Sequence, residues 1–209
     1  MTDDNFYDIG IADVHQWVLE LPAPASGGEL DDPWMFGDGR RLSDPGPLTS
    51  RPFREGPQRS FSVANSGRTP IADEQVANVF RKLAPDDVQT FPIRIEGAGK
   101  GFHVINATKR FSCVDKKNSR EVQIYPSDGV APERVGTYRA IHGLRIDRTK
   151  TAGAQVFRIQ GYPSALIVSA KIKSALEEVG NLGVSFERVT GPQEPSPPPR
   201  EPPAARRGG

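Results

Sequence analysis

The sequence predicts an α+β domain, mainly antiparallel sheet or meander, with two or so short amphipathic helices packed on it and a disordered Pro-rich tail. Three observations carry this prediction. Apolar and polar residues alternate through 91–96, as in a half-buried strand. Apolar residues recur at helical spacing in 76–83 and 172–179. After Val189 the chain is dominated by proline and polar residues, which cannot bury a core.

The clearest secondary-structure pattern lies in residues 155–189. Residues 156–159 predict a short strand, which Gly161 to Pro163 should break because proline fixes φ and lacks a donor. A second apolar run covers 166–168. Ser169 is placed as the N-cap of a helix that ends at Gly180, and residues 184–189 predict a closing strand. Because a helix this short is unstable alone, its apolar stripe must pack on a sheet.

The N-terminal part predicts strands at 6–11, 17–21 and 61–63, with a small-residue loop at 22–28. Residues 43–60 are rich in Pro, Gly and Arg and predict an irregular loop. Asp73 is placed as the N-cap of a second helix, which Ala84-Pro85 ends because a residue before proline disfavours helical geometry.

The middle of the chain predicts a β-meander. Strands are expected at 91–96 and 102–107 around the glycine-rich turn 97–101, and further strands at 110–115, 121–125 and 138–146, the last with a bulge at Gly143. Residues 1–189 are therefore expected to form a single domain, followed by a disordered tail at 190–209.

Composition limits the function. Twenty-seven basic residues against 26 acidic ones give a net charge of +1, so no broad field attracts nucleic acid or anionic lipid, and neither is expected as a partner. No apolar run has the ~18 residues of a membrane span, and the first ten residues lack the features of a signal peptide. A cytoplasmic location is expected, and the composition gives no prediction of oligomeric state.

No motif predicts catalysis, a cofactor or a metal site. The segment EGAGKG at 96–101 lacks the first glycine and the hydroxyl residue of a phosphate-binding loop, and a flexible hairpin turn is favoured. His15, His103 and His142 have no paired spacing, and Cys113 lies in an apolar strand-like run, which favours a buried thiol. A hydrolase would need Cys113 beside His103 or His142 in an open cleft.

Four stretches carry a family resemblance: DPWMF at 32–36, LAPDDVQTFPIRIEG at 83–97, VGTYRAIHGLRID at 135–147, and VFRIQGYPSALIVSAKIKSALEEVGNLGVSFERV at 156–189. Together they resemble the immunity proteins of bacterial polymorphic toxin systems, a family formerly catalogued as a domain of unknown function and common in myxobacterial proteomes. The resemblance covers most of residues 5–189, without the loop at 43–60 or the tail.

The resemblance implies a non-enzymatic cytoplasmic protein that binds and neutralises a cognate toxin by occluding its active site. Trp34, Phe36 and Tyr162 are the candidate partner-binding residues, because aromatic residues are enriched at binding hot spots. Burial in the core is the competing interpretation for each of them. Two other functions stay open: the Cys/His hydrolase, and an interaction module that recruits partners through its Pro-rich tail.

Overall fold

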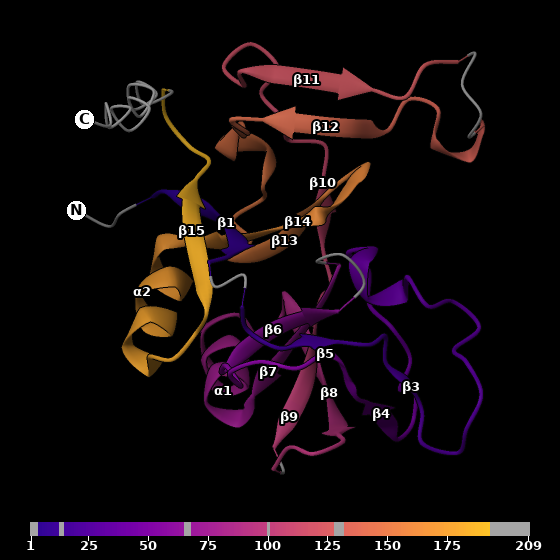
Figure 1. Ribbon diagram of the computed structural model, residues 1–209. Helices are drawn as coiled ribbons and strands as arrows, with labels where there is room; N and C mark the ends of the chain where they lie inside the picture. The colour runs from indigo at the N-terminus through magenta and orange to yellow at the C-terminus, as the bar shows by residue number, and fades with distance from the viewer. Residues whose placement is uncertain (1–3, 13–14, 65–67, 100, 128–131, 193–209) are drawn as a thin grey trace, which may run out of the picture.

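Two sheets and two helices make up most of the fold, in a computed structural model that describes residues 4–12, 15–64, 68–99, 101–127 and 132–192 (Figure 1). The six-stranded sheet contains, in spatial order, β3 (Ala23–Pro24), β4 (Leu48–Ser50), β8 (Val88–Ile95), β9 (Phe102–Ala107), β7 (Thr69–Asp73) and β6 (Phe61–Ala64). The five-stranded sheet contains β10 (Arg110–Phe111), β13 (Val156–Ile159), β14 (Tyr162–Ser169), β1 (Phe6–Ile11) and β15 (Val184–Arg188). Pairing is antiparallel except between β4 and β8 and between β10 and β13.

Smaller elements flank the sheets. Strand β2 (Val18–Leu19) pairs with β5 (Pro52–Arg54), and β11 (Glu121–Ile124) pairs with β12 (Tyr138–His142) as a two-stranded arm at the far end of the molecule from β4 and β8 (Figure 1). Short 3-10 helices occur at η1 (Met35–Gly37), η3 (Pro132–Arg134) and η4 (Arg148–Lys150).

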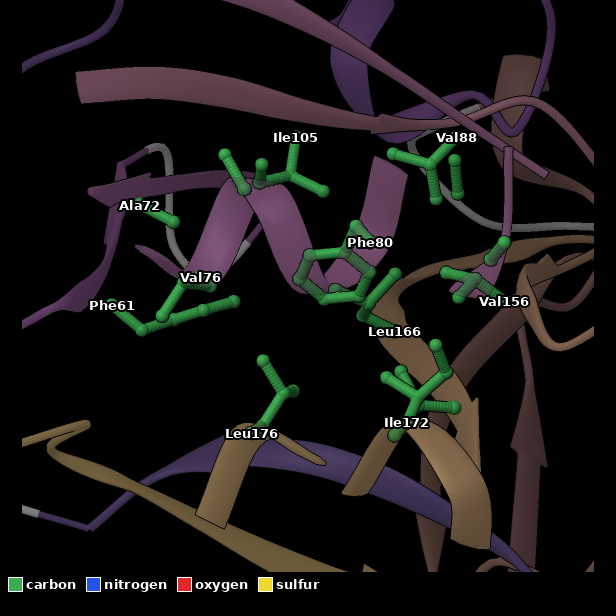
Figure 2. Packing of buried hydrophobic residues seen from close by; sticks show 14 of the residues in the cluster. Phe61, Ala72, Val76, Phe80, Val88, Ile105, Val156, Leu166, Ile172 and Leu176 are labelled. Atoms are coloured by element: carbon green, nitrogen blue, oxygen red, sulfur yellow. The ribbon is translucent and has the colours of Figure 1, made fainter. Parts of the chain in front are cut away.

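The two helices, α1 (Glu74–Leu83) and α2 (Ala170–Val179), lie between the sheets and pack on each other. Both begin as the sequence predicts, because the Asp73 and Ser169 side chains accept the backbone N–H groups of Val76 and Ile172. Figure 2 shows Phe80 of α1 close to Leu166 of β14 and Ile172 of α2. The buried stripes therefore join both sheets into one hydrophobic cluster.

Each sheet has a second apolar cluster on its outer face. Outside the six-stranded sheet, Trp17 and Phe36 pack on Phe102 and Phe91, with ring centroids 5.6 and 5.9 Å apart. Outside the five-stranded sheet, the β11–β12 arm and residues 144–146 cover a cluster around Phe157. The chain is thus layered, with apolar side chains filling the spaces between successive layers.

A buried carboxylate connects the two sheets directly. Asp87, in the turn between α1 and β8, is 4% exposed. Its Oδ2 accepts the backbone N–H groups of Gln155 and Val156 at 2.5 and 3.2 Å, and its Oδ1 lies 2.5 Å from Lys109 Nζ. The start of β13 is therefore tied to the turn that leads into the six-stranded sheet.

The antiparallel α+β class is confirmed, but several sequence predictions are wrong in detail. The loop predicted at 43–60 contains β4 and β5, and the predicted loop at 22–28 contains β3. The expected meander is instead divided among the six-stranded sheet, β10 of the five-stranded sheet and the separate arm. Pro163 lies inside β14, so the break after β13 is confined to residues 160–161. The tail expected at 190–209 lies outside the described residues from 193 onward, and Thr190 is buried.

Candidate partner-binding site

A cleft of about 490 Å³ opens where segments from both halves of the fold meet. Its walls come from the loop after η1, Arg68 just before β7, Arg110 of β10, the end of the β11–β12 arm, and the turn between β13 and β14. The last of these is residues 159–164, so the same turn that ends β13 forms one wall of the cleft. We call this feature the Tyr–Arg cleft, after the residue types that line it.

Three half-buried tyrosines, Tyr125, Tyr138 and Tyr162, give the cleft its aromatic surface. The rings of Tyr138 and Tyr162 meet edge to face, with centroids 6.4 Å apart. Burial raises the pKa of Tyr138, so its phenol stays protonated and able to donate. Tyrosine combines a large apolar ring with a polar tip, which suits a surface that is covered only when a partner binds.

Four arginines, Arg68, Arg110, Arg134 and Arg139, share the same lining. The Arg68 guanidinium lies 5.1 Å from the centroid of the Trp34 ring, and that of Arg134 lies 5.7 Å from the Tyr125 ring. Arg110 donates to the backbone carbonyl of Asp38 at 3.2 Å. The guanidinium groups of Arg68, Arg110 and Arg134 are therefore held by neighbouring rings and loops, which lowers the entropy lost when a partner orders them.

A fifth arginine lies beneath the cleft. Arg158 of β13 is 1% exposed and donates to the backbone carbonyls of Pro163 and Arg68 at 3.1 and 2.7 Å. Burial lowers the pKa of its guanidinium to about 10. The positive charge of Arg68 also lowers this pKa, whereas the negative charge of Asp8 raises it. The residue remains charged at neutral pH, and its hydrogen bonds fix the cleft wall at Pro163 to the segment before β7.

A comparison with protein families matches residues 29–191 to a family described as the immunity protein family Imm11. The match spans most of the chain and includes all the residues that line the cleft. The chain belongs to the Imm11 immunity protein family. The resemblance drawn from the sequence is thereby confirmed, and the family supports an immunity role for this protein. A comparison with curated proteins found no match.

The three residues predicted to bind a partner have different positions in this Imm11 protein. Trp34 is 47% exposed and flanks the cleft through its contact with Arg68, and Tyr162 lines the cleft. Phe36, in contrast, is 0% exposed and packs on Phe91. Phe36 is therefore a core residue, and the partner-binding prediction fails for it because no part of its ring reaches the surface.

The hydrolase alternative does not survive in the form that used Cys113. This cysteine is 0% exposed within the cluster outside the five-stranded sheet, and burial raises the pKa of its thiol to about 11. A nucleophile needs access to substrate and a substantial thiolate fraction, and Cys113 has neither. His103 is also buried, with its Nε2 3.4 Å from Glu74 Oε2 and its pKa lowered by burial.

Neither a metal-binding cluster nor a membrane-spanning helix is found in the part of the chain that the structure describes. No group of three or more His, Cys, Asp or Glu residues in it is arranged to hold a metal ion. None of its helices has the length and apolar character needed to span a bilayer.

The arginines and two of the tyrosines of the cleft are residues that the sequence did not single out. They are spread over about 70 positions between Arg68 and Arg139 and come from different elements. A weak signal exists in residues 134–139, where two arginines and a tyrosine fall within six positions. Only the fold shows that Arg68 and Arg110 face the same cleft.

Proposed function

We propose that this Imm11 protein acts in the cytoplasm, where it neutralises a cognate protein toxin by binding it stoichiometrically, with the Tyr–Arg cleft at the centre of the contact surface. Family membership supports the immunity role. The observation that carries the choice of surface is the gathering of Trp34, Tyr125, Tyr138 and Tyr162 with four arginines around one cleft. Trp, Tyr and Arg are the residue types that dominate binding hot spots.

Neutralisation would be steric. A stable protein–protein interface buries about 1,600 Å² in total, which is more than the cleft alone can supply. The rim adds exposed apolar side chains on the same side of the fold, Trp34 at 47% and Val135 at 42% exposed. We therefore expect one segment of the toxin to insert into the cleft and the surrounding toxin surface to contact the rim. In this complex the immunity protein would cover the active site of the toxin.

The test is co-expression with the product of the neighbouring gene, as the candidate toxin. We expect growth to be rescued and a one-to-one complex to co-purify. A Trp34→Ala, Tyr162→Ala double variant should weaken the complex by at least tenfold, about the effect of losing one hot-spot residue. The matched control is Phe53→Ala, because Phe53 is 76% exposed on β5 and is not part of the cleft lining.

The outcomes separate the alternatives. Rescue without a complex would contradict neutralisation by binding and would favour an indirect or enzymatic antidote. Equal loss of affinity in the Phe53→Ala control would contradict the cleft as the contact surface. The scaffolding alternative depends on a tail that lies outside the described residues, and deletion of residues 193–209 without effect on the complex would exclude it.

A further inference from the structure

The chemistry of the cleft indicates what part of the toxin it receives. Resting on the proposed function, we infer that the Tyr–Arg cleft binds an extended acidic segment of the toxin, with the carboxylates of Asp or Glu side chains paired to the arginines and the chain packed against the tyrosines. An immunity role alone does not specify the chemistry of the partner.

Positive charge is concentrated in the cleft. Its lining contains four arginines and two carboxylates, Asp38 and Glu133, a balance of +2, whereas the whole chain carries only +1. The Asp38 carboxylate is already engaged, because Arg40 Nε lies 3.1 Å from its Oδ2. Glu133 contacts Arg134 at 3.6 Å across an exposed pair, which is worth little. The arginines are thus only partly neutralised by the protein itself.

The buried Arg158 adds to this field. Among the ion pairs of the described residues none involves Arg158, which donates to the carbonyl oxygens of Pro163 and Arg68. A charge in the protein interior is screened less than one in water, so its potential extends into the cleft above it. The Asp8 carboxyl, which attracts Arg158, has its pKa raised to about 7 by burial and so compensates this charge only in part near neutrality.

The geometry suits carboxylates on an extended chain. A guanidinium that stacks on a ring uses its flat face, while its N–H donors lie in the plane and remain suited to a carboxylate. The guanidinium groups of Arg68 and Arg134 lie 5.1 and 5.7 Å from the centroids of the Trp34 and Tyr125 rings, and Arg139 is exposed on the adjacent wall. A volume of about 490 Å³ holds a few side chains of a single strand and not a folded element.

Nucleic acid is the competing polyanion, and the observations favour protein. Binding a phosphate backbone depends on many basic contacts over a long surface. Here the lining of a single cleft carries a balance of +2 on a chain whose total is +1.

The test uses fluorescein-labelled peptides and fluorescence polarisation with the full chain. The probes are an extended acidic decapeptide that contains Asp, Glu and one Tyr, the same peptide with Asn and Gln in place of the acids, and a ten-nucleotide single-stranded DNA. We expect the acidic peptide to bind, and the amide peptide to bind about tenfold more weakly or worse, because hydrogen bonds to charged groups are the stronger class. Binding should weaken further as salt is raised from 50 to 300 mM.

Matched variants locate the effect. Arg68→Gln with Arg139→Gln should weaken the binding of the acidic peptide about tenfold, because two partly desolvated charge contacts are lost. The control is Arg94→Gln with Lys82→Gln, which removes the same two charges from exposed sites on β8 and α1 outside the cleft lining. Thermal melts of all variants confirm that they fold. An unchanged affinity in the double variant, equal binding of the two peptides, or tighter binding of the DNA would each overturn the inference.

The toxin complex separates this inference from the proposed function. If the toxin binds and the charge variants leave its association rate and salt dependence unchanged, the acidic-segment inference is wrong while neutralisation by binding stands. If no toxin complex forms, the proposed function fails, and the peptide measurements alone decide whether the cleft selects acidic chains.

Discussion

Replacing Asp87 by Asn should reveal how strongly the two sheets depend on one carboxylate. The substitution keeps the shape of the side chain and removes its charge. In the native protein, one oxygen accepts the backbone N–H groups of Gln155 and Val156 at the start of β13, and the other lies 2.5 Å from Lys109 Nζ. An asparagine that keeps its oxygen toward Val156 must direct its NH₂ group at the Lys109 ammonium, where two donors face each other.

The expected loss is about 3 kcal/mol. Each hydrogen bond to β13 falls from the charged class, about 1.5–3 kcal/mol, to the neutral class near 1 kcal/mol. The Lys109 pair adds less than about 1 kcal/mol because that side chain is 40% exposed. Urea unfolding followed by circular dichroism measures the loss as a shift in midpoint.

Asp86→Asn is the matched control, since Asp86 is the exposed neighbour of Asp87, and surface changes usually stay within about 0.5 kcal/mol. A loss below about 1 kcal/mol at Asp87, or one no larger than at Asp86, would refute the assignment of this carboxylate as a connection between the sheets, since the bonds at stake are worth more.

Three other perturbations test the placement of single residues. Phe36→Ala should destabilise the fold by about 3–5 kcal/mol, whereas Trp34→Ala should cost less than about 1 kcal/mol, because only Phe36 is buried; equal losses in urea unfolding would contradict this. Cys113 should resist Ellman's reagent at pH 8 until urea unfolds the chain, because its thiol is sealed and its pKa is raised to about 11; rapid reaction of the native protein would show the thiol to be open. Burial raises the pKa of Asp8 from 3.8 to about 7, so the folded state holds a proton that the unfolded chain has lost, and the free energy of unfolding should fall as the pH rises through that window. Asp8→Asn should flatten that slope between pH 3.8 and about 7, and an unchanged slope would contradict the shift.

The sequence predicted the parts of the fold whose order is local. Both helices start at the predicted caps. The N-cap and the apolar stripe of each helix lie within one segment of about ten residues, so both can be recognised from the local sequence. The strands at 6–11 and 102–107 were also located correctly. Each of these elements is long enough to show a period of its own.

The errors concern elements that long-range pairing creates. Strands β4 and β5 contain three residues each, too few to show any alternation, and their Pro- and Arg-rich surroundings resemble a loop. Strand β4 exists because it lies beside β8 in parallel, with Leu48 opposite Ile93. Such a partner is more than 40 positions away and leaves no trace in the local sequence.

The same limit applies to the candidate site. The general enrichment of aromatic residues at interfaces pointed to Trp34 and Tyr162, and both flank or line the cleft. The same enrichment also pointed to Phe36, which is two residues from Trp34. The chain turns at η1, so that Phe36 is buried while Trp34 is exposed, and the sequence does not show which of the two rings lies inside. The arginines went unnoticed because exposed arginines occur throughout the chain, and only their convergence distinguishes these.

Arg158 shows how the fold and the site depend on each other. Arginine is rarely buried completely, and an apolar residue in the middle of β13 would avoid the cost of dehydrating a charge. Its Nε has no hydrogen-bond partner among the described residues, so the site is not optimised for stability alone. The guanidinium holds the backbone carbonyls of Pro163 and Arg68 together. Its charge also places positive potential beneath the cleft that these two residues help to line. A buried cation at this point is hard to explain as packing, and its position beneath the cleft supports the inference that the cleft binds carboxylates.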